Sequence, residues 1–525
     1  MKPRLIFVSA TTFVLMAVSL QLAAQNQKHH HYKLVNLGTF GGPQNYINGD
    51  DLLVPYMEAA QSVNGAGSLI GWADTSTLDP YNPFCFNGDC YVSHAFEWHN
   101  GFKTDLGVLP GGQNSATSWI SANGLVAGTS QNGELDPLYP GFPENHAVLW
   151  RDGNIIDLKT LPEGGYESGA EAVNSRGQVV GWAFNTVPDP YSMGDWSPLY
   201  NFYEPYPYSY QNRAFLWENG VMRDLGTLGT GTDAYAVAIN ERGQVIGISY
   251  TSSTPNPIIT ACSSGGAAGG SILPTQDPFL WENGKMIDLG SLGGTCGFPQ
   301  AINDRGQVIG NSDLVGDVIS YPFLWEKTTG MQSLGTLGGS FALAEMINDS
   351  GQVVGGSYLT GDNQAHAFLW DGKMHDLGAL NNGCSWAFGI NSQKQVVGNL
   401  CDPGGGVFLW ENGGPMVDLN TLVSSTGGLS AYGALEINDR GEIAGAATDG
   451  NNNYYAMLVI PCDENHPGIE DCDYSLADAN TEAQGRGQSS VVVNQNDGRL
   501  VGRRELLNGR FIHRGGFAGV RSPNN

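Results

Sequence analysis

The sequence predicts an all-β protein, an eight-bladed β-propeller of four-stranded antiparallel blades closed by its N-terminal strand. Three motifs, D-L-G-T-L-G-G, I-N-D-R-G-Q-V-V-G and H-A-F-L-W-E-N-G, recur in degraded copies from about residue 32 to residue 460. Periods of ~40–45 residues are typical of propellers. Two anchors each mark eight units. They are Trp98, Trp150, Trp217, Trp281, Trp325, Trp370, Trp410 and Val459, and Asn64, Asn123, Asn174, Asn240, Asn303, Asn348, Asn391 and Asn438.

Each unit contains four short strands separated by turn signals. Asn303 stands three residues before Gly306, which suits a type I turn between the first two strands. Asn-Gly or Asp-Gly pairs predict tight hairpins between the third and fourth. The adjacent apolar pair Val308-Ile309 indicates a sheet covered on both faces, and Gly310 permits a close backbone approach near a crowded axis. In this unit we expect strands at 301–303, 307–312, 322–325 and 331–334.

The two ends of the repeat region are complementary. The last unit stops after its third strand, at residues 455–460, and the first begins with an orphan fourth strand, at residues 32–38. Pairing them would remove two open sheet edges. An open β-solenoid is the alternative, and it would not need complementary half-units.

The third motif is complete in His366-Ala367-Phe368-Leu369-Trp370 and less regular at residues 94–98. On these residues the chain resembles the HAF family of probable extracellular repeat proteins, over roughly residues 32–460. The resemblance implies an exported repeat protein, and it brings no established activity or site residues. Other copies lack one or two of the three letters, which argues against a shared catalytic histidine.

The N-terminus has the layout of a signal peptide, residues 1–24. Lys2 and Arg4 precede an uncharged stretch that ends at Ala24. An uncleaved membrane anchor is the alternative, because ~20 apolar residues can span a bilayer. We expect bacterial export to the outside of the cell and no membrane span after cleavage.

The net charge is −27, from 24 basic and 51 acidic residues. This balance argues against a nucleic-acid or anionic-membrane partner for the body of the protein. It is compatible with a cationic ligand or calcium, although we expect no cofactor and assign no metal site.

Eight cysteines in an exported chain indicate disulfides. In a propeller blade, the loop between the second and third strands and the connection to the next blade emerge on one face. Six cysteines fall in such segments, and the thiols are too dispersed for a zinc cluster, which is the competing interpretation. We expect the pairs Cys85–Cys90, Cys262–Cys296, Cys384–Cys401 and Cys462–Cys472.

Long insertions lie on the same face, at residues 74–93, 129–145, 183–212 and 250–277. Insertions on one face of a repeat protein often form its binding face. Their aromatic residues suit carbohydrate or peptide binding, because each ring gives a rigid contact and each polar tip a directional one. Packing of the loops onto the ring is the alternative. The candidate ligand-binding residues are Tyr81, Tyr139, Tyr191, Trp196, Tyr203, Glu204, Tyr206 and Tyr208.

No catalytic residue is assigned, because nucleophile-elbow, H-E-x-x-H, Walker A and EF-hand sequences are absent. Asp79, Asp136, Asp189 and Glu204 could pair as catalytic carboxylates or be solvated loop acids. The recurrent aspartate of D-L-G is interpreted as a turn hydrogen-bonding residue. Residues 29–31, three histidines, are interpreted as a disordered lead-in rather than a metal site.

Residues 461–525 leave the repeat pattern and predict a disulfide loop followed by a partly disordered, Arg-rich tail; residues 491–502 weakly echo the second motif. The function predicted is a secreted or cell-surface binding protein for an extracellular carbohydrate or peptide. The alternatives are an extracellular glycoside hydrolase or lyase and a structural or adhesive surface protein. The oligomeric state stays open.

Overall fold

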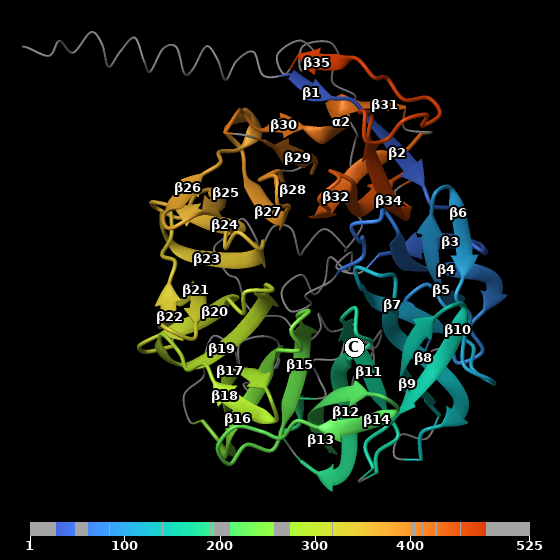
Figure 1. The fold of residues 1–525 in the computed structure, drawn as a ribbon, viewed down its shortest axis with the longest axis vertical. Helices are drawn as coiled ribbons and strands as arrows, with labels where there is room; N and C mark the ends of the chain where they lie inside the picture. The colour runs from blue at the N-terminus through green and yellow to red at the C-terminus, as the bar shows by residue number, and fades with distance from the viewer. Residues whose placement is uncertain are drawn as a thin grey trace, which may run out of the picture.

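The protein is all-β and propeller-like. In the computed structural model, antiparallel sheets follow one another around a common centre, each with its first strand toward the centre and its fourth toward the rim (Figure 1). The predicted signal peptide and the Arg-rich tail lie outside the described residues. The structure describes residues 28–47, 61–82, 85–137, 141–162, 164–189, 191–193, 210–256, 274–317, 319–401, 405–411, 413–425, 428–451 and 453–478.

Four-stranded groups make up the first half of the chain. Three are separate sheets: β3 (Gly41–Tyr46), β4 (Leu69–Leu78), β5 (Tyr91–His99) and β6 (Phe102–Asp105); β7 (Ser115–Ile120), β8 (Val126–Leu135), β9 (Pro143–Arg151) and β10 (Asn154–Lys159); β11 (Ser168–Val173), β12 (Val179–Pro188), β13 (Tyr210–Glu218) and β14 (Val221–Asp224). The next group is β15 (Ala234–Ile239), β16 (Val245–Pro255), β17 (Pro274–Glu282) and β18 (Lys285–Asp288).

The second half continues this order. A single parallel pair, Gln276 with Cys296, joins β17 to β19 of the following group. The groups are β19 (Gly293–Ile302), β20 (Val308–Leu314), β21 (Ser320–Glu326) and β22 (Gly330–Ser333); β23 (Gly338–Ile347), β24 (Val353–Leu359), β25 (Ala365–Trp370) and β26 (Met374–Asp376); β27 (Ser385–Ile390), β28 (Val396–Leu400), β29 (Val407–Trp410) and β30 (Val417–Asp418). The described helices η2 (Leu380–Asn382) and α2 (Leu419–Leu422) are short connections.

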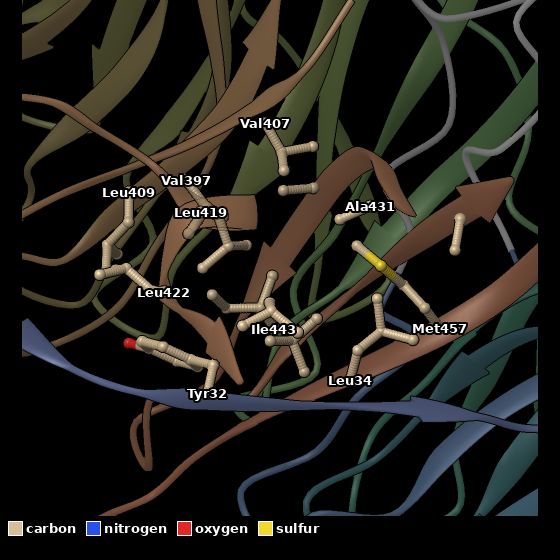
Figure 2. Close-up of a cluster of buried hydrophobic side chains, with 14 of the residues drawn as sticks. Tyr32, Leu34, Val397, Val407, Leu409, Leu419, Leu422, Ala431, Ile443 and Met457 are labelled. Carbon is tan, nitrogen blue, oxygen red and sulfur yellow. The ribbon is translucent and has the colours of Figure 1, made fainter. Parts of the chain in front are cut away.

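The two ends of the repeat region pair as predicted. The last group contains β32 (Ser430–Ile437), β33 (Ile443–Thr448) and β34 (Tyr454–Pro461), and β2 (Tyr32–Asn36) adds to β34 in antiparallel register. Figure 2 shows that β2 directs Tyr32 and Leu34 into a buried cluster that also contains Leu409, Ile443 and Met457. Burying each large apolar side chain stabilises the fold by ~1.5–3 kcal/mol. The N-terminal strand is therefore part of the core.

The segments flanking this pairing are more ordered than expected. Strand β31 (Val423–Ser425) runs parallel to β2, and β1 (Lys28–His30) pairs with β35 (Leu476–Asp478). The interpretation of residues 29–31 as a disordered lead-in was wrong. His29 is buried, with its Nδ1 2.6 Å from Glu411 Oε2, so an ion-pairing partner and a strand partner both hold the segment.

The second strand of each unit is covered on both faces, as predicted. Val308 and Ile309 are both fully buried. A Cβ on Gly310 would lie 2.1 Å from Phe298 O, because β19 carries a bulge between Pro299 and Ala301. The glycine thus accommodates the bulged first strand. That strand is longer than predicted, because the preceding L-G-G segment also joins the ladder from Gly293.

Four hairpins between third and fourth strands confirm the prediction of tight Asn-Gly or Asp-Gly turns, and Asn412 of a further predicted pair lies outside the described residues. Both residues have positive φ in Asn100-Gly101, Asp152-Gly153, Asn219-Gly220 and Asn283-Gly284, as a type I′ turn requires. Asp371-Gly372 differs, because Trp370 pairs with Met374 and leaves a three-residue connection.

The asparagine of each I-N-x-x-G turn links its sheet to the next one. Asn303 Oδ1 accepts from Arg305 N (3.1 Å) and Gln307 N (3.0 Å), which closes its own turn. Asn303 Nδ2 donates to Gln307 Oε1 (2.7 Å) and, in the next unit, to Asn348 O (3.1 Å). One side chain therefore satisfies a buried turn and bridges two sheets.

The same bridge recurs along the repeat region, and we call the series the asparagine relay. In the second copy the bridging residue is Asn123, two positions along, and its Nδ2 donates to Ser175 O (2.9 Å). The relay returns from Asn438 in the last group to Asn64 O in the first, at 2.8 Å. The other bridges are Asn64 to Ser121 O, Asn174 to Asn240 O, Asn240 to Asn303 O, Asn348 to Asn391 O and Asn391 to Asn438 O.

We predict that Asn303→Asp lowers the free energy of unfolding by about 1–3 kcal/mol, because Asn348 O and Gln307 Oε1 lose a donor and face a carboxylate. Urea denaturation followed by tryptophan fluorescence measures the change. Asn283→Asp, in an exposed type I′ turn, is the matched control and should stay within about 0.5 kcal/mol of the parent. Equal losses in the two variants would contradict the role of the relay.

Candidate functional site

The four long insertions leave the sheets at equivalent places. Each second strand is extended past a bulge by a further pair with its third strand: Leu78 with Tyr91, Leu135 with Pro143, Pro188 with Tyr210 and Pro255 with Pro274. We call the surface formed by these strand ends the long-loop face. The extension is shared, so the insertions begin from one structural template.

The disulfides that the structure describes join the cysteines that were predicted to pair. Cys85–Cys90 closes part of the first insertion, and Cys462–Cys472 closes the loop after β34. Cys384–Cys401 joins a sheet-to-sheet connection to a loop between second and third strands. This bond confirms that the two kinds of segment meet on one face. Cys296 is also disulfide-bonded, and Cys262, its expected partner, lies outside the described residues.

The aspartates of the D-P dipeptides are buried, so their interpretation as solvated acids was wrong. Asp79, Asp136 and Asp189 directly follow β4, β8 and β12. Asp79 Oδ1 accepts from Tyr81 N at 2.9 Å, and Asp189 Oδ1 accepts from Tyr191 N at 2.8 Å. These carboxylates close the turns that begin the insertions.

A polar arrangement recurs where each insertion meets the next sheet. Between the β3–β6 and β7–β10 sheets, at what we call the first junction, it consists of Asp74, Asp79, Ser93 and Asn114. Ser93 N donates to Asn114 Oδ1 (2.8 Å), Asn114 Nδ2 to Asp79 Oδ2 (3.0 Å), and Ser93 Oγ to Asp74 Oδ1 (2.7 Å). All four side chains are buried. Each of them has a hydrogen-bond partner within the junction.

The third junction, between the β11–β14 and β15–β18 sheets, has different residues at the same positions. They are Phe184, Asp189, Asn212 and Asp233. Asn212 N donates to Asp233 Oδ1 at 2.7 Å, which repeats the bond from Ser93 N. Burial, reinforced by the charge of Asp189, raises the pKa of Asp233 to about 7. Gln131, Asp136, Asn145 and Glu167 occupy these positions at the second junction, where Asn145 N donates to Glu167 Oε2.

The first junction extends toward the surface as a pair of carboxyl groups. Gln44 N donates to Asp74 Oδ2 (2.9 Å), and Gln44 Nε2 and Tyr46 OH donate to Asp89 Oδ2 (3.2 and 3.0 Å). Asp89 is half-buried within the Cys85–Cys90 loop. Burial first, and then the hydrogen bond to Asp89, raise the pKa of Asp74 to about 7. Asp74 therefore keeps its proton to a higher pH than an ordinary aspartate does.

An aromatic pair lies beside these carboxyl groups. The rings of Tyr46 and Trp72 stack with centroids 5.7 Å apart and planes inclined by 20°. Both side chains are half-buried. Aromatic faces next to carboxyl and amide groups suit ligands with both apolar and hydroxyl surfaces. Sequence reasoning singled out none of these residues. Tyr46 and Trp72 precede the first insertion, and Asp74 and Asp89 lie within it but belong to no recognisable motif.

The predicted aromatic residues are only partly described. Tyr81 and Tyr191 are half-buried and follow equivalent turns, in the first and third insertions. They belong to different junctions. Exposed apolar residues on the same face are Leu78 (66% exposed), Leu135 (52%) and Val187 (49%). Tyr139, Trp196, Tyr203, Glu204, Tyr206 and Tyr208 lie outside the described residues.

The histidine of H-A-F pairs with the aspartate of D-L-G in the same sheet. His94 Nδ1 lies 2.9 Å from Asp105 Oδ2, and the same pairing joins His146 to Asp157 and His366 to Asp376. Asp105 Oδ1 accepts from Gly107 N at 2.8 Å, which confirms the interpretation of this aspartate as a turn residue. Where Asp277 replaces the histidine, burial and then the charge of Asp288 raise the pKa of Asp277 to about 7.

No cluster of three or more His, Cys, Asp or Glu side chains suited to a metal ion occurs among the residues that the structure describes. In the same part of the chain, no helix is both long enough and apolar enough to cross a membrane.

No family model matches the chain, and no curated protein matches its sequence. Among solved structures, the β-propeller domain of the Trilobed protease from Pyrococcus furiosus is 10% identical, with a TM-score of 0.38, over 69% of this chain and 97% of that one. A prolyl endopeptidase gives 10% identity and a TM-score of 0.41, over 87% and 61%. Porphyromonas gingivalis dipeptidyl peptidase 4 gives 10% and 0.40, over 71% and 57%. Such distant likeness carries no argument about function.

We predict that Asp74→Asn makes stability less dependent on pH. The pKa of Asp74 is about 7 in the folded state and about 4 in the unfolded state. The folded state therefore binds more protons between these values, and the Asp74 contribution to stability falls as pH rises through that window. The variant should match the parent near pH 4 and exceed its unfolding free energy by about 1–3 kcal/mol at pH 8. Urea midpoints at both pH values test this, and an equal loss at both would contradict it.

Proposed function

We propose that the protein is an extracellular, closed eight-bladed β-propeller that binds a carbohydrate on its long-loop face, at the first junction. The observation that carries this proposal is the stacked Tyr46–Trp72 pair next to the Asp74–Asp89 carboxyl pair. The pairing of β2 with β34 and the return of the asparagine relay to Asn64 support the closed ring.

The chemistry of the first junction favours a sugar over a charged peptide. A sugar ring offers an apolar face that can lie on an exposed part of Tyr46 or Trp72. Its hydroxyl groups can donate to Asp89 and accept from the Gln44 amide, which already contacts Asp89 (3.2 Å). The exposed Leu78 and the half-buried Tyr81 extend the apolar surface nearby. A peptide ligand that uses the same aromatic surface is the second outcome of the test below.

The geometry favours binding over glycoside hydrolysis. Asp74 and Asp89 are hydrogen-bonded to each other, whereas the two carboxyl groups of a glycosidase are ~5–9.5 Å apart so that a sugar carbon or a water fits between them. Asp74 is also fully buried behind Asp89. These two carboxyl groups therefore suit recognition and positioning of hydroxyl groups.

We predict that Trp72→Ala and Asp89→Asn each weaken binding of the ligand at least tenfold, which corresponds to ~1.4 kcal/mol. A glycan and peptide array on the protein without residues 1–24 would identify the ligand, and calorimetry would give its affinity for each variant.

Phe341→Ala is the matched control. Phe341 is a half-buried aromatic residue that contacts Tyr358, and both lie in the β23–β26 sheet, away from the first junction. It should bind normally. A further variant with residues 194–209 replaced by a Gly-Ser segment tests the aromatic residues of the third insertion. Binding lost there but retained in Trp72→Ala would contradict a first-junction site, and absence of any ligand would favour a structural or adhesive role.

A further inference from the structure

The first and third junctions are matched position by position, and their differences point to a ligand at the third. Asp79 and Asp189 each follow a ten-residue second strand. Asn114 and Asp233 each directly precede the first strand of the next sheet. At the first junction the amide of Asn114 donates to Asp79 (3.0 Å). At the third junction a second carboxylate stands where that amide would be.

The third junction also leaves buried polar atoms without partners. Asn212 Oδ1 and Nδ2 and Asp233 Oδ2 have no hydrogen-bond partner, although both residues are 0% exposed. The cause is a cross-strand neighbour. Ser93 lies opposite Asp74 and donates to it, whereas Asn212 lies opposite Phe184, which offers no acceptor. Such buried unpaired groups are rare and require an explanation, such as an ion or an ordered water.

The backbone fixes which oxygens face the unpaired space. Met193 N and Asn212 N both donate to Asp233 Oδ1, at 3.0 and 2.7 Å. This carboxylate is thus held by one oxygen, and Oδ2 is left for another partner. Asp189 is held in the same way through Oδ1 by Tyr191 N. Asn212 and Ala214 lie on the same face of β13. Ala214 packs in one core cluster with Ala234, the residue that follows Asp233, so this face of β13 is directed toward the next sheet.

We propose that the third junction binds one divalent cation, calcium by its chemistry, through Asp189, Asp233 Oδ2 and Asn212 Oδ1. Calcium takes six to eight oxygen ligands from carboxylates, amides, backbone carbonyls and water. Two carboxylates neutralise its charge, and a cation between them replaces the hydrogen that Asn114 supplies at the first junction. The ion would join the base of the third insertion to the β15–β18 sheet. The first-junction carbohydrate site does not depend on it.

The experiment uses the protein without residues 1–24, stripped with EDTA and exchanged into metal-free buffer. Calorimetry with CaCl₂ should give one site per chain, with a Kd in the range of ~0.1–1 mM found for extracellular modules. In 10 mM CaCl₂ the midpoint of thermal unfolding should rise by about 2–5 °C. MgCl₂ at the same concentration should give a smaller rise, because magnesium retains its waters.

Asp233→Asn is the decisive variant, because it recreates the Asp–Asn pair of the first junction within the third. It should fold with a thermal midpoint equal to or above that of the stripped parent and lose the calcium response. Asp74→Asn is the matched control and should keep that response. An unchanged midpoint in the parent, or a calcium response that persists in Asp233→Asn, would overturn the proposal and assign the paired acids to a bound proton or water.

Discussion

The asparagine relay is the constraint on which the rest of the molecule depends. Apart from Asn123, each relay residue closes a turn with its Oδ1 and reaches the next turn with its Nδ2, as Asn303 does toward Asn348. Because the partner is a backbone carbonyl, the bond does not depend on the side chain of the neighbour. A single repeated residue type can therefore align successive sheets at a fixed spacing while other positions drift.

This constraint explains why the two faces of the propeller-like fold differ. The relay and the type I′ turns leave little freedom on one face, where an insertion would break a bond to the next unit. The long-loop face is held instead by junctions whose residues vary, from Asp79 with Asn114 to Asp189 with Asp233. Junctions of this kind can accept new side chains without loss of the sheet arrangement. Variation on that face is thus compatible with a constant fold.

The sequence alone was sufficient for features with local causes. The period and the Asn-Gly hairpins follow from short spacings and turn chemistry. The pairing of β2 with β34 follows from the incomplete units at the two ends of the repeat region, and three disulfides follow from the topology of a repeated blade. The junctions were not predictable in this way. Asp79 meets Asn114, 35 residues further on, only after two sheets have packed, and its burial reverses the expectation of a solvated acid. His29 likewise gains Glu411 as a partner from 382 residues away.

The burial of acids on the long-loop face connects stability to function. Asp74, Asp233 and Asp277 all lie at that end of their sheets, and burial raises the pKa of each to about 7. In the β7–β10 sheet, His146 stands at the position that Asp277 occupies in its own sheet, and His146 holds Asp157 ionised. Although burial opposes ionisation, the hydrogen bonds from His146 and Lys159 lower the pKa of Asp157 to about 2. A paired acid stabilises its sheet at neutral pH, whereas an acid with a raised pKa destabilises it unless a proton, a cation or a ligand hydroxyl is present. Asp74, Asp233 and Asp277 thus lie on the face where the asparagine relay leaves the structure free to vary.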